Sequence, residues 1–121
     1  MDIPSNKVTG KFYVRVGGVL LPLSGDATLK NLGGIERKPV IGNEVHGFQE
    51  EPVAVEVELS IADKGVVDIK TLASIVNATI TVETDRGDVY TIPNAWAATA
   101  GELSSKGEIK ITFNAAECEK N

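Results

Sequence analysis

Two glutamates separated by one residue are the side chains best placed for chemistry. Glu56 and Glu58 lie in a stretch whose odd positions are aliphatic. A strand would therefore hold both carboxylates on one face, about 7 Å apart. Glycosidases use carboxylate pairs at comparable spacing. Acids at alternate positions are also the commonest way to finish the solvent face of a strand, so we predict no enzyme and no catalytic residue.

Other reactive groups are scarce. The only histidine, His46, stands beside Gly47 without a nucleophile-elbow motif, so we interpret it as a surface or interface residue. Cys118 is the only cysteine, which excludes an internal disulfide and a Cys/His zinc site within one chain. No acidic cluster matches a calcium loop, and no glycine pair continues into a phosphate-binding motif. We predict no metal site and no cofactor.

The composition bounds the class of protein. The chain has 121 residues and a net charge of −5, so we expect one domain over residues 1–121 that buries roughly 65% of its extended surface. An acidic chain is a poor ligand for the phosphate backbone of nucleic acids. No apolar run approaches the length of about 18 residues that spans a membrane, and the N-terminal residues lack the pattern of a secretory signal. Cytoplasmic synthesis is the expectation.

Alternating patterns dominate the chain. From Val53 to Ile61 the odd positions are apolar and the even positions are mostly polar, which predicts a half-buried antiparallel strand. Glycines predict two tight hairpins, at residues 16–19 and 85–88. Pro93 is expected to end a strand or to lie at an edge. The further predicted strands are Phe12–Val16, Thr79–Thr84, Val89–Pro93 and Ile109–Phe113.

Three segments depart from this pattern. Asp68 can cap a short helix over about residues 68–76, with Ile69, Leu72, Ala73 and Val76 on one face. Residues 31–51 form a long loop or hairpin whose apolar content suggests docking on another surface. Residues 115–121 are expected to be a frayed tail. The predicted fold is mainly β, an antiparallel β-barrel or sandwich with one short flanking α-helix.

The residues alone leave several functions open. Head-to-tail contacts between copies could close into a ring. A small-molecule-binding β-barrel is the alternative, and it requires a cavity lined by Val55, Val57, Ile80 and Ile109. A hydrolase that uses Glu56 and Glu58 is a further one, and it requires a cleft with a raised carboxyl pKa.

An ordered set of segments resembles the tail tube proteins of Mu-like contractile-tailed bacteriophages and prophages. These segments cover most of the chain, with Tyr90 and Asn94–Trp96 between the last two; they are Gly10–Gly18, Leu32–Arg37, Gly47–Glu50, Ala78–Gly87 and Gly107–Phe113. The resemblance implies a structural virion subunit of the tail-tube type. Type VI secretion tube proteins and subunits of phage-tail-like bacteriocins share the fold and are neighbouring possibilities.

The resemblance also implies an assembly. Six subunits are expected to form a ring, and rings are expected to stack into a tube inside the tail sheath. The tape-measure protein and, transiently, DNA would occupy the lumen of this virion component, which is made in the bacterial host cytoplasm. An acidic wall would let DNA pass without binding, and the lumen candidates are Glu56, Glu58 and Glu83.

Contacts between rings are assigned to the long loop or hairpin. Its apolar residues would be buried by the next ring, while charged residues supply register; a hairpin packed within one subunit is the alternative. The ring-stacking candidates are Ile35, Glu36, Arg37, Lys38, Val40, Ile41, Val45 and Phe48.

Overall fold

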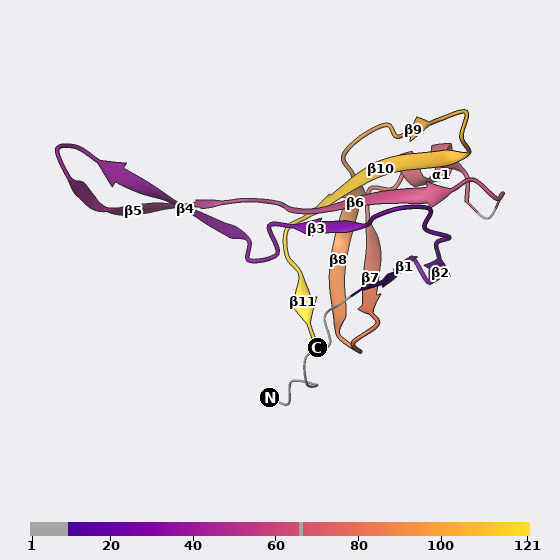
Figure 1. Ribbon diagram of the computed structural model, residues 1–121, viewed down its shortest axis with the longest axis horizontal. Helices are drawn as coiled ribbons and strands as arrows, with labels where there is room; N and C mark the ends of the chain where they lie inside the picture. Colours follow the sequence, from indigo (N-terminus) through magenta and orange to yellow (C-terminus); the bar gives the residue numbers. More distant parts are fainter. Residues whose placement is uncertain (1–9, 66) are drawn as a thin grey trace.

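The computed structural model describes residues 10–65 and 67–121, and these residues form eleven β-strands and one α-helix (Figure 1). Every strand pairing is antiparallel, and one path of hydrogen bonds joins seven strands in the order β2-β1-β7-β8-β10-β6-β3. The prediction of a mainly β antiparallel fold with one short helix is confirmed.

The strands on this path group into two sheets that share β8 (Val89–Ala97). Sheet A contains β1 (Phe12–Val16), β2 (Val19–Leu20), β7 (Ala78–Thr84) and β11 (Glu119–Lys120). Sheet B contains β3 (Thr28–Lys30), β6 (Val55–Ala62), β9 (Glu102–Leu103) and β10 (Glu108–Ala115). Figure 1 shows β6 and β10 crossing β7 and β8 at a steep angle.

A bulge in β8 makes the corner between the two sheets. The pairs Ile80–Ile92 and Ala78–Ala95 enclose one residue of β7 but two residues of β8, Pro93 and Asn94. Asn94 has a positive φ of 54°, and bulges of this kind bend a strand and let it change sheets. The expectation that Pro93 ends a strand or lies at an edge is therefore wrong, because β8 runs on to Ala97 and lies between β7 and β10. The proline lies in the bulge, where a missing N–H costs no ladder hydrogen bond.

The core fills the angle between the sheets. The odd positions of β6 are at most 3% exposed, as the alternation predicts, and Phe113 of β10 is fully buried beside them. Sheet A contributes Val14, Ile80, Val82 and Ile92, all with no exposed surface. Because both sheets bury one face only, each presents the opposite face to the outside.

Both predicted tight turns are present. Gly17 and Gly18 have φ values of 59° and 88° and join β1 to β2 through the pair Val16–Val19. Two positive φ angles are what a two-residue hairpin turn requires. In the turn between β7 and β8, Gly87 has a positive φ of 98° and its N–H donates to the Thr84 carbonyl at 3.0 Å.

The helix is shorter than predicted. α1 spans Ile69–Ala73, and the Asp68 carboxylate caps it by accepting a hydrogen bond from the Lys70 backbone N–H at 3.3 Å. Leu72 is buried against the core. Ser74 ends the helix, and its hydroxyl donates to the Thr71 carbonyl at 2.8 Å. Val76 therefore lies beyond the helix and is 80% exposed instead of sharing the apolar stripe.

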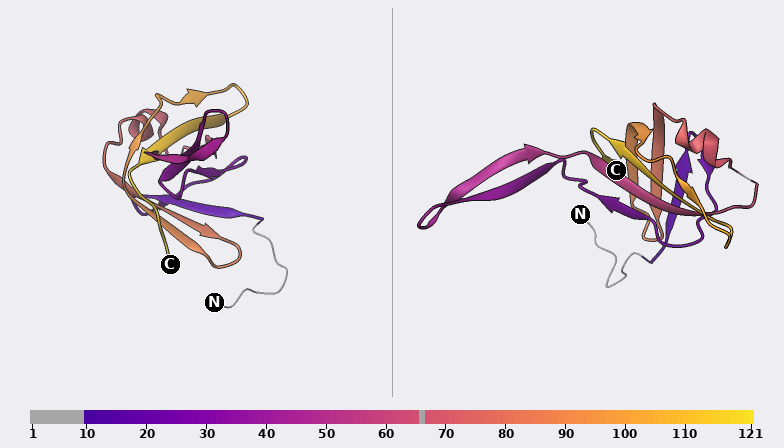
Figure 2. Two further views of the ribbon diagram at one scale, coloured as in Figure 1. Left: turned by 90° about the vertical axis from the view of Figure 1, so that its left-hand side faces the viewer. Right: turned by 90° about the horizontal axis from the view of Figure 1, so that it is seen from above.

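Residues 35–52 form a hairpin that projects from the body. β4 (Ile35–Ile41) and β5 (Val45–Pro52) pair only with each other in the described structure, and every residue of both strands is exposed. Figure 2 shows that this hairpin extends well beyond the two sheets. An isolated hairpin is marginally stable in water, and this one has no cover from the two sheets.

The C-terminal residues differ from the expected frayed tail. β10 continues to Ala115, and β11 pairs Glu119 with Thr91 and Lys120 with Tyr90 at the edge of sheet A. Asn121 adds a side-chain hydrogen bond from the Val89 N–H, 2.8 Å long. Within residues 10–65 and 67–121, no helix has the length and apolar character needed to cross a membrane.

Candidate functional site

The side chains of β3, β6 and β10 that point away from the core form one surface, which we call the polar face. Glu56 and Glu58 both lie on it, because the residues between and beside them in β6 are buried. The structure therefore brings together two of the three predicted lumen residues.

Cross-strand register fixes the neighbours of these two glutamates. Glu56 lies opposite Lys30 of β3 on one side and Asn114 of β10 on the other. Asn114 in turn lies opposite Trp96 of β8. Residues directly opposite in an antiparallel pair share a face, so these four side chains form one row across sheet B.

An ion pair links the edge of the sheet to its centre. Lys30 Nζ lies 2.9 Å from Glu58 Oε1, and both side chains remain close to half exposed. The hydrogen bond to Glu58, together with the negative charge of that carboxylate, raises the pKa of the Lys30 ammonium. A pair this exposed adds little to stability, so its main effect is to hold the two charges in place.

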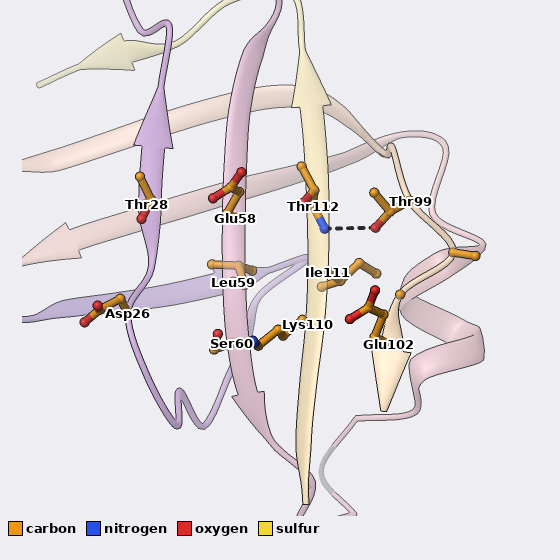
Figure 3. A pocket seen from close by; sticks show the side chains of 12 residues that line it. Asp26, Thr28, Glu58, Leu59, Ser60, Thr99, Glu102, Lys110, Ile111 and Thr112 are labelled. Atoms are coloured by element: carbon orange, nitrogen blue, oxygen red, sulfur yellow. Dashed lines mark hydrogen bonds between the residues drawn. The ribbon is translucent and has the colours of Figure 1, made fainter. Parts of the chain in front are cut away.

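The polar face is hollowed beside Glu58. The depression has a volume of about 500 Å³. Figure 3 shows the side chains from β3, β6 and β10 that line it. The Thr112 backbone N–H donates to Thr99 Oγ1 at 3.2 Å along its rim. Asp26 and Glu102 also line this depression, from outside the three strands.

Carboxylates outnumber cations on this surface. The polar face and the depression together hold five carboxylates and two ammonium groups, a formal charge of −3; the residues are Asp26, Glu56, Glu58, Glu102, Glu108, Lys30 and Lys110. The surface therefore repels a polyanion such as DNA.

The third predicted lumen residue lies elsewhere. Glu83 belongs to β7, on the outward side of sheet A, and its carboxylate pairs with the Arg15 guanidinium at 3.2 Å. The outward sides of the two sheets face away from each other across the shared core. The structure therefore does not bring Glu83 together with Glu56 and Glu58.

The hairpin carries the eight predicted ring-stacking residues on two different faces. Register places Ile35, Arg37 and Ile41 on one face, where their partners across the hairpin are Pro52, Glu50 and Val45. Phe48 shares that face, since the Arg37 guanidinium carbon lies 5.6 Å from its ring centroid. The opposite face carries the remaining candidates, Glu36, Lys38 and Val40.

Ion pairs support the hairpin on both faces. Arg37 Nε lies 3.4 Å from Glu50 Oε1 on the first face, and Lys38 Nζ lies 2.9 Å from Glu51 Oε2 on the second. Cross-strand pairs of opposite charge stabilise a two-stranded ribbon by a few tenths of a kcal/mol up to about 1 kcal/mol each. His46 is the extra residue of a bulge between Val40 and Ile41, near the hairpin tip.

Neither alternative function gains support from the geometry. Val55, Val57, Ile80 and Ile109, which a ligand-binding barrel would need around a cavity, are at most 1% exposed and pack into the core. Across the described residues, no group of three or more His, Cys, Asp or Glu side chains could hold a metal ion. Of the two carboxylates that a hydrolase would need in one cleft, Glu58 lines the depression and pairs with Lys30, whereas Glu56 is not part of that lining.

Several charged residues of the polar face and the depression were missed by sequence reasoning. Lys30 lies in a three-residue strand, and Asp26 and Glu102 lie at or near loops, so none of them carries an alternation signal of its own. Lys110 did carry one. It alternates with the buried residues Ile109 and Ile111 and could have been assigned to the same face as Glu58 once β6 and β10 were paired.

Comparisons with known proteins agree with one another. The family model described as "Phage tail tube protein" matches residues 5–120. A curated relative, the Mu-like prophage FluMu tail tube protein of Haemophilus influenzae (strain ATCC 51907 / DSM 11121 / KW20 / Rd), is 39% identical over 111 residues, which cover 92% of this chain and 93% of the relative.

Two solved structures share the fold. The anti-feeding prophage cap, a tube-terminating cap, has a TM-score of 0.64 at 14% identity and is matched over 100% of this chain and 95% of its own. The sheath/tube terminator of an extracellular contractile injection system, PVC, in its extended state has a TM-score of 0.60 at 15% identity, with 100% and 97% coverage. Both similarities extend over the whole domain, including the hairpin.

Proposed function

Because this chain belongs to the phage tail tube protein family, we propose that its copies join into six-membered rings that stack into the inner tube of a contractile phage or prophage tail. The role is structural and requires no catalysis. The projecting hairpin carries this proposal most directly, since a subunit that works alone has no use for a long, uncovered ribbon.

The polar face is the proposed wall of the lumen. It is the outward side of β3, β6 and β10, it carries a formal charge of −3 together with the depression, and Glu56 and Glu58 stand near its centre. Six copies around a channel would surround the passing DNA with carboxylates. Repulsion prevents the counterion release that drives proteins onto DNA, so DNA slides through without being held.

Glu83 has no place in this lumen. It lies on the outward side of sheet A, where Arg15 balances its charge. If sheet B lines the channel, sheet A faces away from it. We assign Glu83 to the outer part of the ring, on the side where the tail sheath would surround the tube.

Further partners follow from the same arrangement. The tape-measure protein would fill the channel during assembly, and DNA would replace it during ejection. The subunit would be made in the cytoplasm of the bacterial host and would end in the virion tail. No binding of specific nucleic-acid sequences is expected from an acidic wall.

The hairpin is the proposed contact between rings. Its exposed apolar residues include Ile41, Val45 and Phe48, which are 67%, 68% and 60% exposed in the single subunit. Apolar side chains gathered at this density on a projecting element mark an interaction surface. Stacking would remove them from water.

Light scattering after size-exclusion chromatography, followed by electron microscopy of concentrated protein, tests this function. We expect rings of six copies and, at high concentration, tubes built from them. Val45→Asp, which places a charge on the apolar side of the hairpin, should abolish tubes and leave the fold intact. A chain that stays monomeric at millimolar concentration and forms no tube under any condition would contradict the proposal.

A further inference from the structure

We propose that the apolar face of the hairpin docks into a groove at the far end of a second copy, between α1 and the β1–β2 turn. This inference rests on the proposed function and names the partner surface for the hairpin. Nothing in the resemblance or in the comparisons identifies that surface. Its support comes from three features: the hairpin face, the groove, and their positions in the subunit.

The apolar face of the hairpin is defined by register. Its apolar members occupy alternate positions of β4 and their partners in β5, and they are Ile35, Pro39, Ile41, Val45, Phe48 and Pro52. Arg37 and Glu50 sit among them as an ion pair, with Arg37 over the Phe48 ring. The charges on this face therefore cancel each other, which lowers the cost of burying it against another apolar surface.

The groove is the complementary feature. It has a volume of about 600 Å³ and lies between the β1–β2 turn and α1. Six apolar side chains line it, Val16, Val19, Leu21, Val67, Leu72 and Ile75, together with the polar residues Asp63, Asp68 and Thr71. Val19 is 48% exposed although it stands beside the core residues Val16 and Leu21, so the groove leaves apolar surface in contact with water.

The two surfaces lie at opposite ends of the subunit. Figure 1 shows the hairpin at one end of the longest axis and β2 and α1 at the other, and the view from above in Figure 2 agrees. One copy cannot satisfy both surfaces by itself. A contact between different surfaces on the two partners is heterologous, and it repeats without limit when the surfaces are at opposite ends. This is the geometry that a stack of rings requires.

The small area of one hairpin contact explains why stacking requires complete rings. A face of two paired strands, the longer of eight residues, measures about 25 Å by 10 Å, so the contact buries only about 500 Å² over both partners. Stable interfaces bury about 1,000 Å² or more. The affinity of a single docked hairpin is therefore low. Six hairpins on one ring bind together, and their linkage raises the overall affinity. Lone subunits would stay apart, and complete rings would stack.

The test uses two variants, each of which disrupts one of the two surfaces. Val45→Asp charges the hairpin face, and Val19→Asp charges the groove; both side chains are substantially exposed, so the fold should survive. Each variant alone should give single rings and no tubes. Rings of one variant mixed with rings of the other should give pairs of rings, because each mixed pair retains one intact hairpin face and one intact groove.

Matched controls carry the same change outside the proposed contact. Gln49→Asp charges the opposite face of the hairpin, and Val76→Asp charges an exposed site outside the groove lining. Both should form tubes as the unmodified chain does. Failure of the mixed rings to pair, or equal loss of tubes in the controls, would overturn the docking.

Crosslinking gives a second measurement that does not depend on variants with lost assembly. In a Cys118→Ser background, Val45→Cys combined with Val19→Cys should give a ladder of disulfide-linked chains when tubes are oxidised. Gln49→Cys combined with Val19→Cys should give none. Tubes without the first ladder would contradict the docking and leave the tube function standing, while absence of tubes from the unmodified chain would contradict both.

Discussion

At the scale of single residues, the polar face owes its character to a small excess of carboxylates that its cations only partly offset. Lys30 is bound to Glu58 at 2.9 Å, and Lys110 lies 3.7 Å from Glu108. Both ammonium groups therefore have a carboxylate partner on the same face. Glu56 lies opposite Lys30 and Asn114 and adds a further negative charge to this surface.

The Lys30–Glu58 pair makes a prediction about pH. The hydrogen bond and charge of Glu58 raise the pKa of Lys30 in the folded chain. A raised pKa means that the pair supports folding below the unfolded value of about 10.4 and loses this support as the pH rises through the folded value. Glu58→Gln should therefore lower the Lys30 pKa toward its ordinary value, as followed by NMR titration of the lysine side chain.

Glu83→Gln is the control for this titration, because Glu83 pairs with Arg15 on the other sheet. It should leave the pKa of Lys30 unchanged. An identical Lys30 pKa in the Glu58→Gln variant and the unmodified chain would show that the pair does not persist in solution.

At the scale of elements, the corner of the fold depends on the bulge in β8. Asn94 adopts a left-handed conformation there, at φ 54°, which asparagine tolerates and a β-branched residue does not. Its side chain is exposed, so substitutions at this site report on backbone strain.

Substitution of Asn94 tests this bulge. Asn94→Val should lower the free energy of unfolding by about 1–2 kcal/mol, whereas Asn94→Gly should change it by a few tenths of a kcal/mol. Urea denaturation of the subunit before assembly measures both. Thr79→Val, at an exposed strand position opposite the bulge, should lie within about 0.5 kcal/mol of the unmodified chain. Equal stability of the Asn94→Val variant would mean that the bulge relaxes.

Removal of the hairpin should affect assembly and leave the stability of the body unchanged. Ile35 and Pro52 are paired at its base, so an Asn-Gly turn in place of residues 36–51 would close the ends with a two-residue hairpin loop. Every removed residue is exposed in the subunit, and the shortened chain should keep its melting temperature within a few degrees while losing the ability to form tubes.

Circular dichroism during heating measures the melting temperature, and electron microscopy shows whether tubes form. The unmodified chain taken through the same purification is the reference. Unfolding of the shortened chain would show that the hairpin supports the body, and normal tubes would show that stacking uses another surface.

Sequence patterns predicted the elements that bury one face and missed those that bury none. β1, β6, β7 and β10 alternate between core and surface, which leaves a period of two in the residue types. The strands of the hairpin have solvent on both faces, so residues 31–51 showed no such period and could be placed only as a loop or hairpin.

Two further differences have local causes. β8 continues beyond Pro93 because this proline lies in a bulge, where its missing N–H costs no ladder hydrogen bond. A sequence pattern does not reveal a bulge. The helix stops at Ala73 because Ser74 bonds back to the preceding turn. Of the candidate site, Glu56 and Glu58 were placed on one face by spacing alone, but the assignment of Glu83 depended on which strands share a sheet, which only the topology supplies.

At the scale of the whole molecule, the subunit separates its surfaces by task. Sheet B presents carboxylates, sheet A pairs Glu83 with Arg15, and exposed apolar surfaces lie at the two ends of the long axis. The proposed ring uses each surface once: the polar face toward the channel, sheet A outward, and the ends for stacking.

Charge reversal tests the channel wall. Glu56→Lys with Glu58→Lys changes the formal charge of the polar face and the depression together from −3 to about +1 per subunit. Tubes of this variant should retain double-stranded DNA in a filter-binding assay at low salt and release it as the salt concentration rises. The unmodified tubes should retain none.

A matched variant changes the same amount of charge on the other sheet. Glu83→Lys with Glu119→Lys alters the outward side of sheet A, where Glu119 lies opposite Thr91. These tubes should bind DNA on their outer surface only, where nuclease removes it, while DNA in the channel of the first variant is protected. Equal protection in both variants would show that Glu56 and Glu58 do not line the channel.

The most direct test of the account is a cryo-electron microscopy reconstruction of tubes assembled from the unmodified chain. We predict rings of six subunits with β3, β6 and β10 facing the central channel, and with the Glu56 and Glu58 side chains directed into it. A reconstruction in which these glutamates face the outside of the tube, or in which sheet A lines the channel, would contradict it.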